Sequence, residues 1–203
     1  YDTSYKDLNV ESTTFKKLSL ISPYFESQGI VNLPKLKTHQ MAVYTGAVKN
    51  LFGLVPGGQK AEMHFRFQDV RRFMEMLLEI LTVAKPMLNI MDGIVAMEGE
   101  GPSAGRPKKL GILLISEDAI ALDYVACKII GLDIKDVPLL EVAKEKGLLN
   151  PDKIEIVGER IEDVAPSSFE LVLRPEISFV KGRLPHFLAS FLDGFLSPKP
   201  VFD

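Results

Sequence analysis

Short apolar segments alternate with amphipathic helical segments, and this alternation limits the fold more than any other feature of the chain. The apolar segments, each predicted to be a strand, are residues 30–33, 87–91, 109–115 and 154–157. Helices are predicted at 41–54, from residue 67 to Pro86, from Ser116 or Asp118 to Gly131, and at 138–146. Such alternation predicts an α/β fold in which a mostly parallel sheet has helices on both faces, as a three-layer sandwich.

One domain accounts for most of the chain. Its 203 residues, 46% of them hydrophobic, are enough for one sizeable core. We expect residues 29–165 to form the α/β core domain. Residues 1–28 are predicted to be an edge segment of the same domain, with strands at 8–12 and 15–21 and a short helix at 23–27.

The C-terminal residues 166–203 have a different pattern. A strand is predicted at 169–173, and apolar residues at spacings of three and four predict an amphipathic helix at 184–196. The proline-containing end is predicted to be a linker. Because the chain begins with Tyr1 and not Met, we expect it to be a region of a longer protein.

Composition excludes several classes of function. The net charge is −3, so there is no basic field of the kind that attracts nucleic acid. The single cysteine, Cys127, excludes an intrachain disulfide and a cysteine-rich metal site, and its apolar neighbours predict a buried, inert thiol. The apolar runs are too short to span a membrane and no secretory signal is present, so we expect a reducing, cytoplasmic setting.

The polar stretch between the first strand and the first helix predicts an anion-binding site. Lys35, Lys37 and His39 lie in this stretch, where a loop that opens a helix offers free backbone N–H groups. Lys49 with Asn50 follows about three helical turns later, and Lys60 comes just after a glycine turn. These groups can gather around a phosphate or a carboxylate. The alternative is that the lysines only solvate the surface.

Two histidines and two carboxylates form a second candidate site. His39, His64, Asp92 and Glu98 could hold a divalent metal, with Asp92 placed at the C-terminal end of a buried strand. The glycines that follow, Gly99 and Gly101, permit positive φ and close backbone approach, as in a ligand lid or metal loop. The alternatives are structural histidines and a tight turn.

Ser116, Asp118 and Asp123 surround the start of a predicted helix. Ser116 or Asp118 can cap this helix, and Ser116 is also a candidate ligand-binding residue. Asp123 lies too far along the helix to cap it. If it faces inward, its charge needs a partner, for which we expect Lys35 or Lys37.

Several motifs in order carry a family resemblance. They are NLPKLKTH, TGAVKNLFG, Asp92-Gly93, Met97-Glu98-Gly99 with Gly101-Pro102, Ser116-Glu117-Asp118, and Ala121-Leu122-Asp123. The sequence from about Gly29 to Val164 resembles the domain of unknown function 362 family, whose members are often labelled uncharacterised iron-sulfur centre proteins. The resemblance implies a 4Fe-4S cluster in an adjoining ferredoxin-like module outside this chain, and hence a redox role with that module or an electron carrier as partner.

Taken together, these features predict a redox domain that binds a small anionic ligand or cofactor. Lys37, His39 and Asp92 are then the candidate catalytic residues. The candidate ligand-binding residues are Lys35, Lys37, Lys49, Asn50, Lys60, Gly99, Gly101 and Ser116. Two alternatives stay open: a metal-assisted, non-redox enzyme acting on an anionic substrate, and a non-catalytic assembly domain whose phenylalanine-rich C-terminal helix docks a partner or a second copy.

Overall fold

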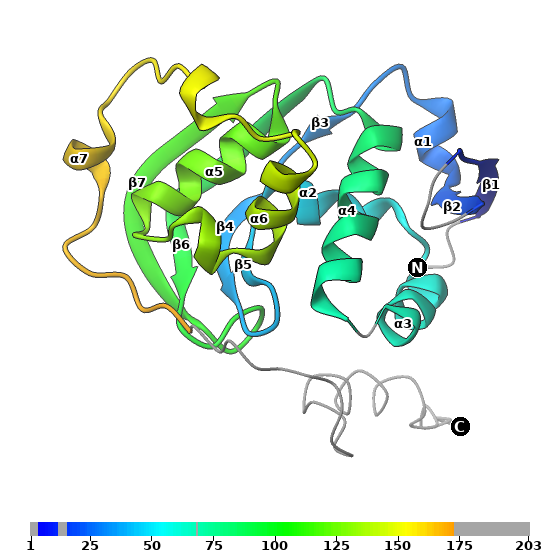
Figure 1. Ribbon diagram of the computed structural model, residues 1–203, viewed down its shortest axis with the longest axis horizontal. Helices are drawn as coiled ribbons and strands as arrows, with labels where there is room; N and C mark the ends of the chain where they lie inside the picture. The colour runs from blue at the N-terminus through cyan, green and yellow to red at the C-terminus, as the bar shows by residue number, and fades with distance from the viewer. Residues whose placement is uncertain (1–3, 12–15, 68, 173–203) are drawn as a thin grey trace, which may run out of the picture.

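The chain folds around a five-stranded sheet with helices packed against it (Figure 1). The structure, a computed structural model, describes residues 4–11, 16–67 and 69–172. The strands of the sheet are β3 (Val31–Asn32), β4 (Lys35–His39), β5 (Val43–Thr45), β6 (Leu88–Glu98) and β7 (Arg106–Ser116). Their order is β3-β6-β4-β5, and β7 also pairs with β6. The long strand β6 is therefore the centre of the sheet.

The sheet is mixed, not mostly parallel. Strands β3 and β4 run parallel to β6, whereas β5 runs antiparallel to β4 and β7 antiparallel to β6. The predicted α/β class is confirmed, but the mostly parallel sheet is not. The strands β6 and β7 are joined by a turn and not by a crossover helix, which is why they are antiparallel.

Four of the helices have recognisable start or stop residues. Helix α4 (Val70–Ala84) begins where the Asp69 carboxylate accepts from the Arg72 N–H at 2.9 Å and ends at Lys85, with φ 43°, just before Pro86. Asp118 caps α5 (Ala119–Ile129) through the Ile120 and Ala121 N–H groups. Helix α6 (Pro138–Glu145) has proline in its first turn. The prediction of a helix in each of these three places is confirmed. The shorter α3 (Gly57–Arg66) follows Pro56.

The remaining elements are short. They are β1 (Tyr5–Asn9), β2 (Lys17–Ile21), α1 (Ser22–Glu26), α2 (Ala47–Asn50), the 3-10 turns η1 (Leu51–Leu54), η2 (Ile134–Asp136) and η3 (Pro151–Lys153), and α7 (Ile161–Val164). Strands β1 and β2 form a separate antiparallel pair, and Leu18 and Leu20 of β2 are fully buried. The N-terminal segment is thus packed on the core without extending the main sheet.

Three local predictions are wrong. Residues 41–54 are not one helix, because they contain β5, α2 and η1. Residues 154–157 and 169–172 are not strands. The helix predicted at 184–196 and the linker after it lie outside the described residues.

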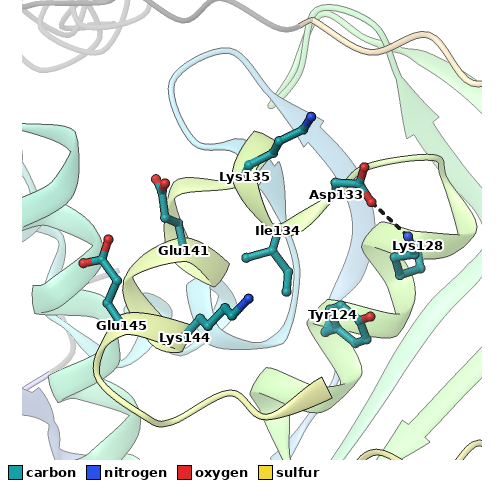
Figure 2. Close-up of a pocket in the computed structure, with 8 residues that line it drawn as sticks. All are labelled: Tyr124, Lys128, Asp133, Ile134, Lys135, Glu141, Lys144 and Glu145. Carbon is teal, nitrogen blue, oxygen red and sulfur yellow. Dashed lines mark hydrogen bonds and ion pairs between the residues drawn. The ribbon is translucent and has the colours of Figure 1, made fainter. Parts of the chain in front are cut away.

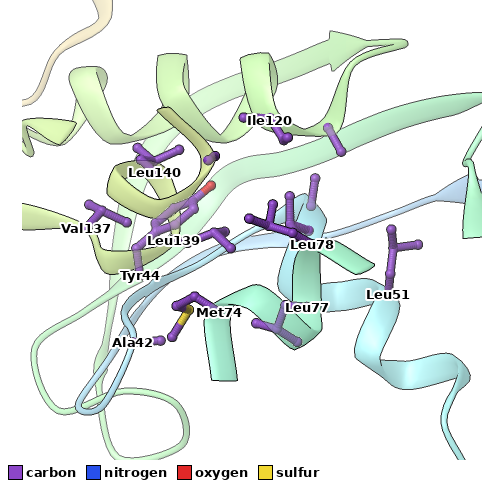
Figure 3. Close-up of a cluster of buried hydrophobic side chains, with 14 of the residues drawn as sticks. Ala42, Tyr44, Leu51, Met74, Leu77, Leu78, Ile120, Val137, Leu139 and Leu140 are labelled. Carbon is purple, nitrogen blue, oxygen red and sulfur yellow. The ribbon is translucent and has the colours of Figure 1, made fainter. Parts of the chain in front are cut away.

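The core lies between the sheet and the helices α4, α5 and α6. Figure 3 shows Met74, Leu77 and Leu78 of α4 directed toward Tyr44 of β5 and Leu140 of α6. All five side chains are buried. The amphipathic pattern of α4 is therefore confirmed, because the apolar stripe of the helix is the side that packs against the core.

The opposite face of the sheet is uncovered in the part of the chain that the structure describes. Val31 and Leu33 are 55% and 67% exposed, and Leu113 and Ile115 of β7 are 55% and 65% exposed. A three-layer sandwich would bury these side chains. The predicted helices on both faces, and with them the third layer, are therefore not found among the described residues.

Candidate anion-binding site

Lys35 and Lys37 are on a strand and not on a loop. They belong to β4, where Lys35 is exposed, Leu36 is fully buried and Lys37 is half-buried. The register of β4 with β6 shifts between the two lysines. Lys35 pairs in register with Asp92 of β6, and its ammonium forms an ion pair with the Asp92 carboxylate. This hydrogen bond holds the pKa of Asp92 below its usual value. Asp92 is therefore within β6, and its predicted position at the end of a strand is wrong.

Lys37, Lys49 and Lys60 form the most cationic part of the predicted site. Lys49, on α2, is half-buried, and burial lowers its pKa from 10.5 to about 8. The positive charges of Lys37 and Lys60 lower the pKa of Lys49 further, which places both close to it. Burial also lowers the pKa of Lys60. Three lysines from β4, α2 and α3 thus share one region.

These lysines have few partners among the described residues. The Lys37 ammonium donates to the Pro102 carbonyl at 3.5 Å, and the Lys60 ammonium donates to the Gly53 carbonyl at 3.3 Å. The described residues contribute no carboxylate to an ion pair with either lysine and no hydrogen-bond partner for Lys49. Since unpaired cations placed together repel one another, the region is suited to an anion that would neutralise them.

Thr45 lies beside Lys37 and adds an unsatisfied hydroxyl. It is the register partner of Lys37 across β4 and β5, so the two side chains are on the same face of the sheet. Thr45 is 8% exposed, and its buried Oγ1 has no hydrogen-bond partner in the described structure. A buried hydroxyl without a partner costs about 1–3 kcal/mol. A ligand held by the lysines is one group that could satisfy it.

Asp123 occupies the N-terminus of α2, inside the stretch 41–54 that was predicted to be one helix. Its carboxylate accepts from the backbone N–H groups of Ala47 at 2.6 Å and Val48 at 3.0 Å, the first residues of α2, and from the Tyr44 hydroxyl at 3.1 Å. Asp123 is fully buried, and burial raises its pKa to about 7 against these three hydrogen bonds, which lower it. The expected pairing of Asp123 with Lys35 or Lys37 is wrong.

Close backbone approach explains the two glycines predicted to bind a cofactor. They lie in the turn between β6 and β7. Gly99 has φ 77°, in the left-handed region, as predicted. A Cβ on Gly101 would lie 2.0 Å from the Thr38 carbonyl oxygen, so only glycine fits against β4. The Gln40 N–H donates to the Gly101 carbonyl and the Thr38 hydroxyl to the Gly99 carbonyl.

The four residues predicted to hold a metal have separate surroundings. His39 is buried, and its Nδ1 accepts from the N–H groups of Met41 and Ala42 at 3.1 and 3.2 Å. Glu98 accepts from the Glu170 N–H at 2.9 Å, with Lys108 at 3.6 Å, while Asp92 binds Lys35. His64 is on α3, and its side chain lies outside the described part.

Among the described residues, no group of three or more His, Cys, Asp or Glu side chains could hold a metal ion. The predicted metal site stays a prediction.

Asn50 and Ser116 belong to a polar network that the sequence did not indicate. The Asn50 amide donates to Asn32 at 2.8 Å, and Asn32 donates to Asn89 and to the Ala47 carbonyl, both at 2.9 Å. The Asn89 amide reaches the Ser116 carbonyl at 3.1 Å. The signal that could have revealed this network is an asparagine inside each of two otherwise apolar strands. The network ties α2 to β3, β6 and the end of β7.

A pocket of about 560 Å³ lies on the helices, between α5 and α6 (Figure 2). Its lining residues are Tyr124, Lys128, Asp133, Ile134, Lys135, Glu141, Lys144 and Glu145. None of them is a predicted site residue. Lys128 forms an ion pair with Asp133 at 2.9 Å, and the lining holds as many carboxylates as lysines. This pocket is therefore less suited to an anion than the Lys37, Lys49 and Lys60 region.

Most of this chain matches a known protein family. The model of the family described as "Domain of unknown function (DUF362)" matches residues 1–128. The chain belongs to this family. The resemblance read from the sequence motifs is thus confirmed, and it carries no established reaction with it.

A thylakoid-associated protein of Synechocystis sp. is 42% identical over 147 residues, which are 72% of this chain and 46% of that protein. The chain therefore spans about half the length of this relative. No solved structure matches the chain. None of the helices in the described ranges is long and apolar enough to cross a membrane.

Two of the family motifs meet in space at the site. The motif TGAVKN supplies Thr45, the N-terminus of α2 and Lys49, and the motif Ala121-Leu122-Asp123 supplies the carboxylate that caps α2. A Cβ on Gly46 would lie 2.2 Å from the Asp123 carboxylate, so this glycine permits the contact. Asp123 thereby fixes the short helix that carries Lys49.

Proposed function

We propose that this DUF362 chain binds a small anion, with a phosphate or carboxylate group, at Lys37, Lys49 and Lys60. The observation that carries the proposal is Lys49, which is half-buried beside two other lysines with no hydrogen-bond partner among the described residues. A protein retains such an arrangement at a cost in stability, because like charges and burial both disfavour the ammonium. A bound anion would remove that cost.

A bound anion is expected to change the protonation of Lys49, because burial and the neighbouring positive charges both lower the pKa of this lysine. With no ligand, the pKa of about 8 leaves part of the Lys49 population neutral just above neutral pH. A bound anion favours the ammonium and raises this pKa. The Thr45 hydroxyl can donate to the same anion. Binding is therefore expected to weaken above about pH 8, where Lys49 loses its proton.

Within this proposal the three candidate catalytic residues have different positions. Lys37 contacts the ligand. His39 uses Nδ1 to accept backbone N–H groups, so any proton it exchanged would be carried by Nε2. Asp92 forms an ion pair with Lys35, and in this proposal it does not contact the anion itself.

A redox role is the second part of the proposal, and it rests on the family resemblance. A 4Fe-4S cluster needs four thiolate ligands, whereas the chain has one cysteine, Cys127, which is fully buried. The residues present therefore do not fit the cluster, which would have to be held by a separate module or carrier. We propose that this partner acts beside the anion site, in a cytoplasmic setting.

Calorimetric titration of the 203-residue protein with inorganic phosphate and with citrate tests the anion site. Lys49→Gln removes one charge-assisted contact and is expected to weaken binding at least tenfold, since such contacts contribute about 1.5–3 kcal/mol. Thr45→Val should weaken it less. Lys153→Gln, at an exposed lysine of η3, is the matched control and should bind as the wild type does. Equal affinity in Lys49→Gln and the wild type would overturn the proposal.

The redox part has its own test. A reduced 4Fe-4S ferredoxin, titrated anaerobically into isotope-labelled protein, is expected to shift the backbone resonances of β4 and α2. Lys49→Gln should leave these shifts in place, because the half-buried Lys49 serves the small anion and is not needed for the surface contact with the ferredoxin. If no resonance moves over the whole titration, the redox part is wrong while the anion site is unaffected.

A further inference from the structure

One face of the sheet exposes a continuous group of large apolar side chains. Val31, Leu33, Leu113 and Ile115 are each more than half exposed, at 55%, 67%, 55% and 65%. Strand register places three of them on one side of the sheet: Val31 pairs with Leu88, Ile115 with Ile90, and Leu113 with Asp92, the partner of Lys35. Leu33 directly follows β3, two residues after Val31. Because directly paired residues point to the same side of a sheet, these side chains share one surface, which we call the open sheet face.

The open sheet face is unlike the surface of a typical soluble domain. The alternate residues of β6, among them Asn89 and Met91, are fully buried under the helices on the other side. Among the described residues, Lys35 with Asp92 is the charged pair at the centre of the open side, and aliphatic side chains surround it. Exposed apolar patches that are contiguous mark surfaces that another polypeptide segment covers.

The chain itself contains one segment that could cover this face. Outside the described ranges lie residues 1–3, 12–15, 68 and 173–203, and only the last is long enough. Its sequence from 184 to 196 places apolar residues at spacings of three and four. They are Leu184, Phe187, Leu188, Phe191, Leu192 and Phe195. This pattern gives one apolar stripe, which needs an apolar surface to pack against.

The last described residues of the chain lie at the β6–β7 turn, beside the strand that carries Leu113 and Ile115. The Gly99 N–H donates to the Glu170 carbonyl at 2.8 Å, and the Glu170 N–H donates to Glu98 at 2.9 Å. Glu170 also forms an ion pair with Arg106, the first residue of β7. Residue 170 is therefore fixed at the turn between β6 and β7, from which β7 leads directly to Leu113 and Ile115.

The connecting residues are long enough to reach. From Arg106 to Leu113 the strand covers about 23 Å, at about 3.3 Å per residue. The eleven residues 173–183 span up to about 36–40 Å when extended. The segment from 184 to 196 can therefore lie over β7 and β3.

We propose that residues 184–196 cover the open sheet face, with their phenylalanine stripe against Val31, Leu33, Leu113 and Ile115. The segment then supplies the third layer, on the second face of the sheet, that the described part of the chain lacks. This inference does not depend on the anion site. It assigns to the phenylalanine-rich segment an intramolecular role in place of binding a partner or a second copy.

Disulfide trapping in the full 203-residue protein tests the contact. The double variant Leu113→Cys with Phe191→Cys, oxidised at low micromolar concentration, is expected to form an intramolecular cross-link visible by non-reducing electrophoresis and peptide mass mapping. Cys127 is fully buried and should not compete. The matched control is Lys153→Cys with Phe191→Cys, which should stay reduced. A cross-link only between two copies would make the occupant a second molecule and would overturn the proposal, as would equal cross-linking in the control.

A second measurement does not require cysteines. The dye ANS, which fluoresces on exposed apolar surfaces, should bind weakly to the wild type and several-fold more strongly to Phe191→Asp with Phe195→Asp, because the face becomes uncovered. Urea denaturation of that variant should still show one cooperative unfolding transition, which would show that the core is folded. Wild-type protein that already binds ANS as strongly as the variant would overturn the proposal.

Discussion

Asp123 of α5 accepts a hydrogen bond of 2.6 Å from the backbone N–H of Ala47, the first residue of α2. This contact joins two segments that are 76 residues apart in the sequence. It fixes the start of a helix of only four residues, too short to be stable without tertiary contacts. The position of Lys49, and with it the proposed anion site, therefore depends on a buried carboxylate that does not touch the ligand.

Replacing Asp123 with alanine should destabilise the protein strongly. The substitution leaves the Ala47 and Val48 N–H groups buried without their acceptor, and it leaves the Tyr44 hydroxyl with only the weak Met91 sulfur at 3.5 Å. Each such group costs about 1–3 kcal/mol, so we expect a loss of about 3 kcal/mol or more in the free energy of unfolding. Urea denaturation measures it, with Glu159→Ala, at an exposed carboxylate, as the control. A loss below about 1 kcal/mol would contradict this account.

The same residue should make stability depend on pH. Burial raises the pKa of Asp123 from 3.8 to about 7. Between about pH 4 and 7 the native state holds a proton that the unfolded chain has released, so stability falls as the pH rises through this range and is level above it. The slope is at most about 1.4 kcal/mol per pH unit.

Urea unfolding at pH 5, 6, 7 and 8 checks this, with Asp123→Asn as the reference because it cannot titrate. The difference between wild type and Asp123→Asn removes the contribution of every other group. If that difference is constant from pH 5 to 8, the pKa of Asp123 is not raised.

Local signals predicted the helices α4, α5 and α6 well. Asp118 before α5, Pro138 at the start of α6 and Pro86 after α4 act within one turn of their own positions, so they can be read without tertiary structure. The glycines that end α5 and α6, Gly131 and Gly147, have positive φ, as a helix end requires.

The sheet was harder to predict because its pairing is not local. The stretch from Lys35 to His39 was interpreted as a polar loop because of its charges. Its alternation of exposed Lys35 and buried Leu36 is instead typical of a strand with one open face. The pairing of Lys35 with Asp92 joins residues 57 apart, and no spacing in the sequence reveals it. The same holds for the partners of Asp123, which are backbone groups that any residue could supply.

Removing the charge of Lys49 should stabilise the protein in the absence of ligand. Lys49→Met keeps most of the length of the side chain and removes the cost of burying an ammonium beside Lys37 and Lys60. We expect a gain of up to about 3 kcal/mol at pH 7, because the pKa is lowered from 10.5 to about 8 and each pKa unit corresponds to about 1.4 kcal/mol. Thermal and urea unfolding measure the gain, and Lys153→Met should show none.

The gain from Lys49→Met should shrink at high pH. The folded pKa of Lys49, about 8, is below the usual lysine value of 10.5. Between these values the native state has lost a proton that the unfolded chain keeps, so the wild type gains stability as the pH rises from 8 to 10.5. The difference between variant and wild type is then smallest near pH 10.5. A difference that does not change with pH would show that the charge of Lys49 is not the cause.

Gly101→Ala should disrupt both the fold and the anion site. The new Cβ would lie 2.0 Å from the Thr38 carbonyl oxygen, a backbone atom that cannot rotate away. Relief requires the β6–β7 turn to separate from β4, which breaks the hydrogen bond from the Gln40 N–H to the Gly101 carbonyl at 3.0 Å. We expect a loss of about 2–4 kcal/mol. Because the Lys37 ammonium donates to the adjacent Pro102 carbonyl, phosphate binding should also weaken.

Gly58→Ala is the matched control for Gly101→Ala, since nothing lies within 4 Å of a Cβ on this glycine of α3. It should leave stability unchanged or raise it slightly, because alanine favours a helix over glycine by up to about 1 kcal/mol. Urea unfolding and phosphate titration of the two variants separate the effects. Equal stability in both variants would mean that the turn moves freely relative to β4, and that Gly101 has no part in placing Lys37.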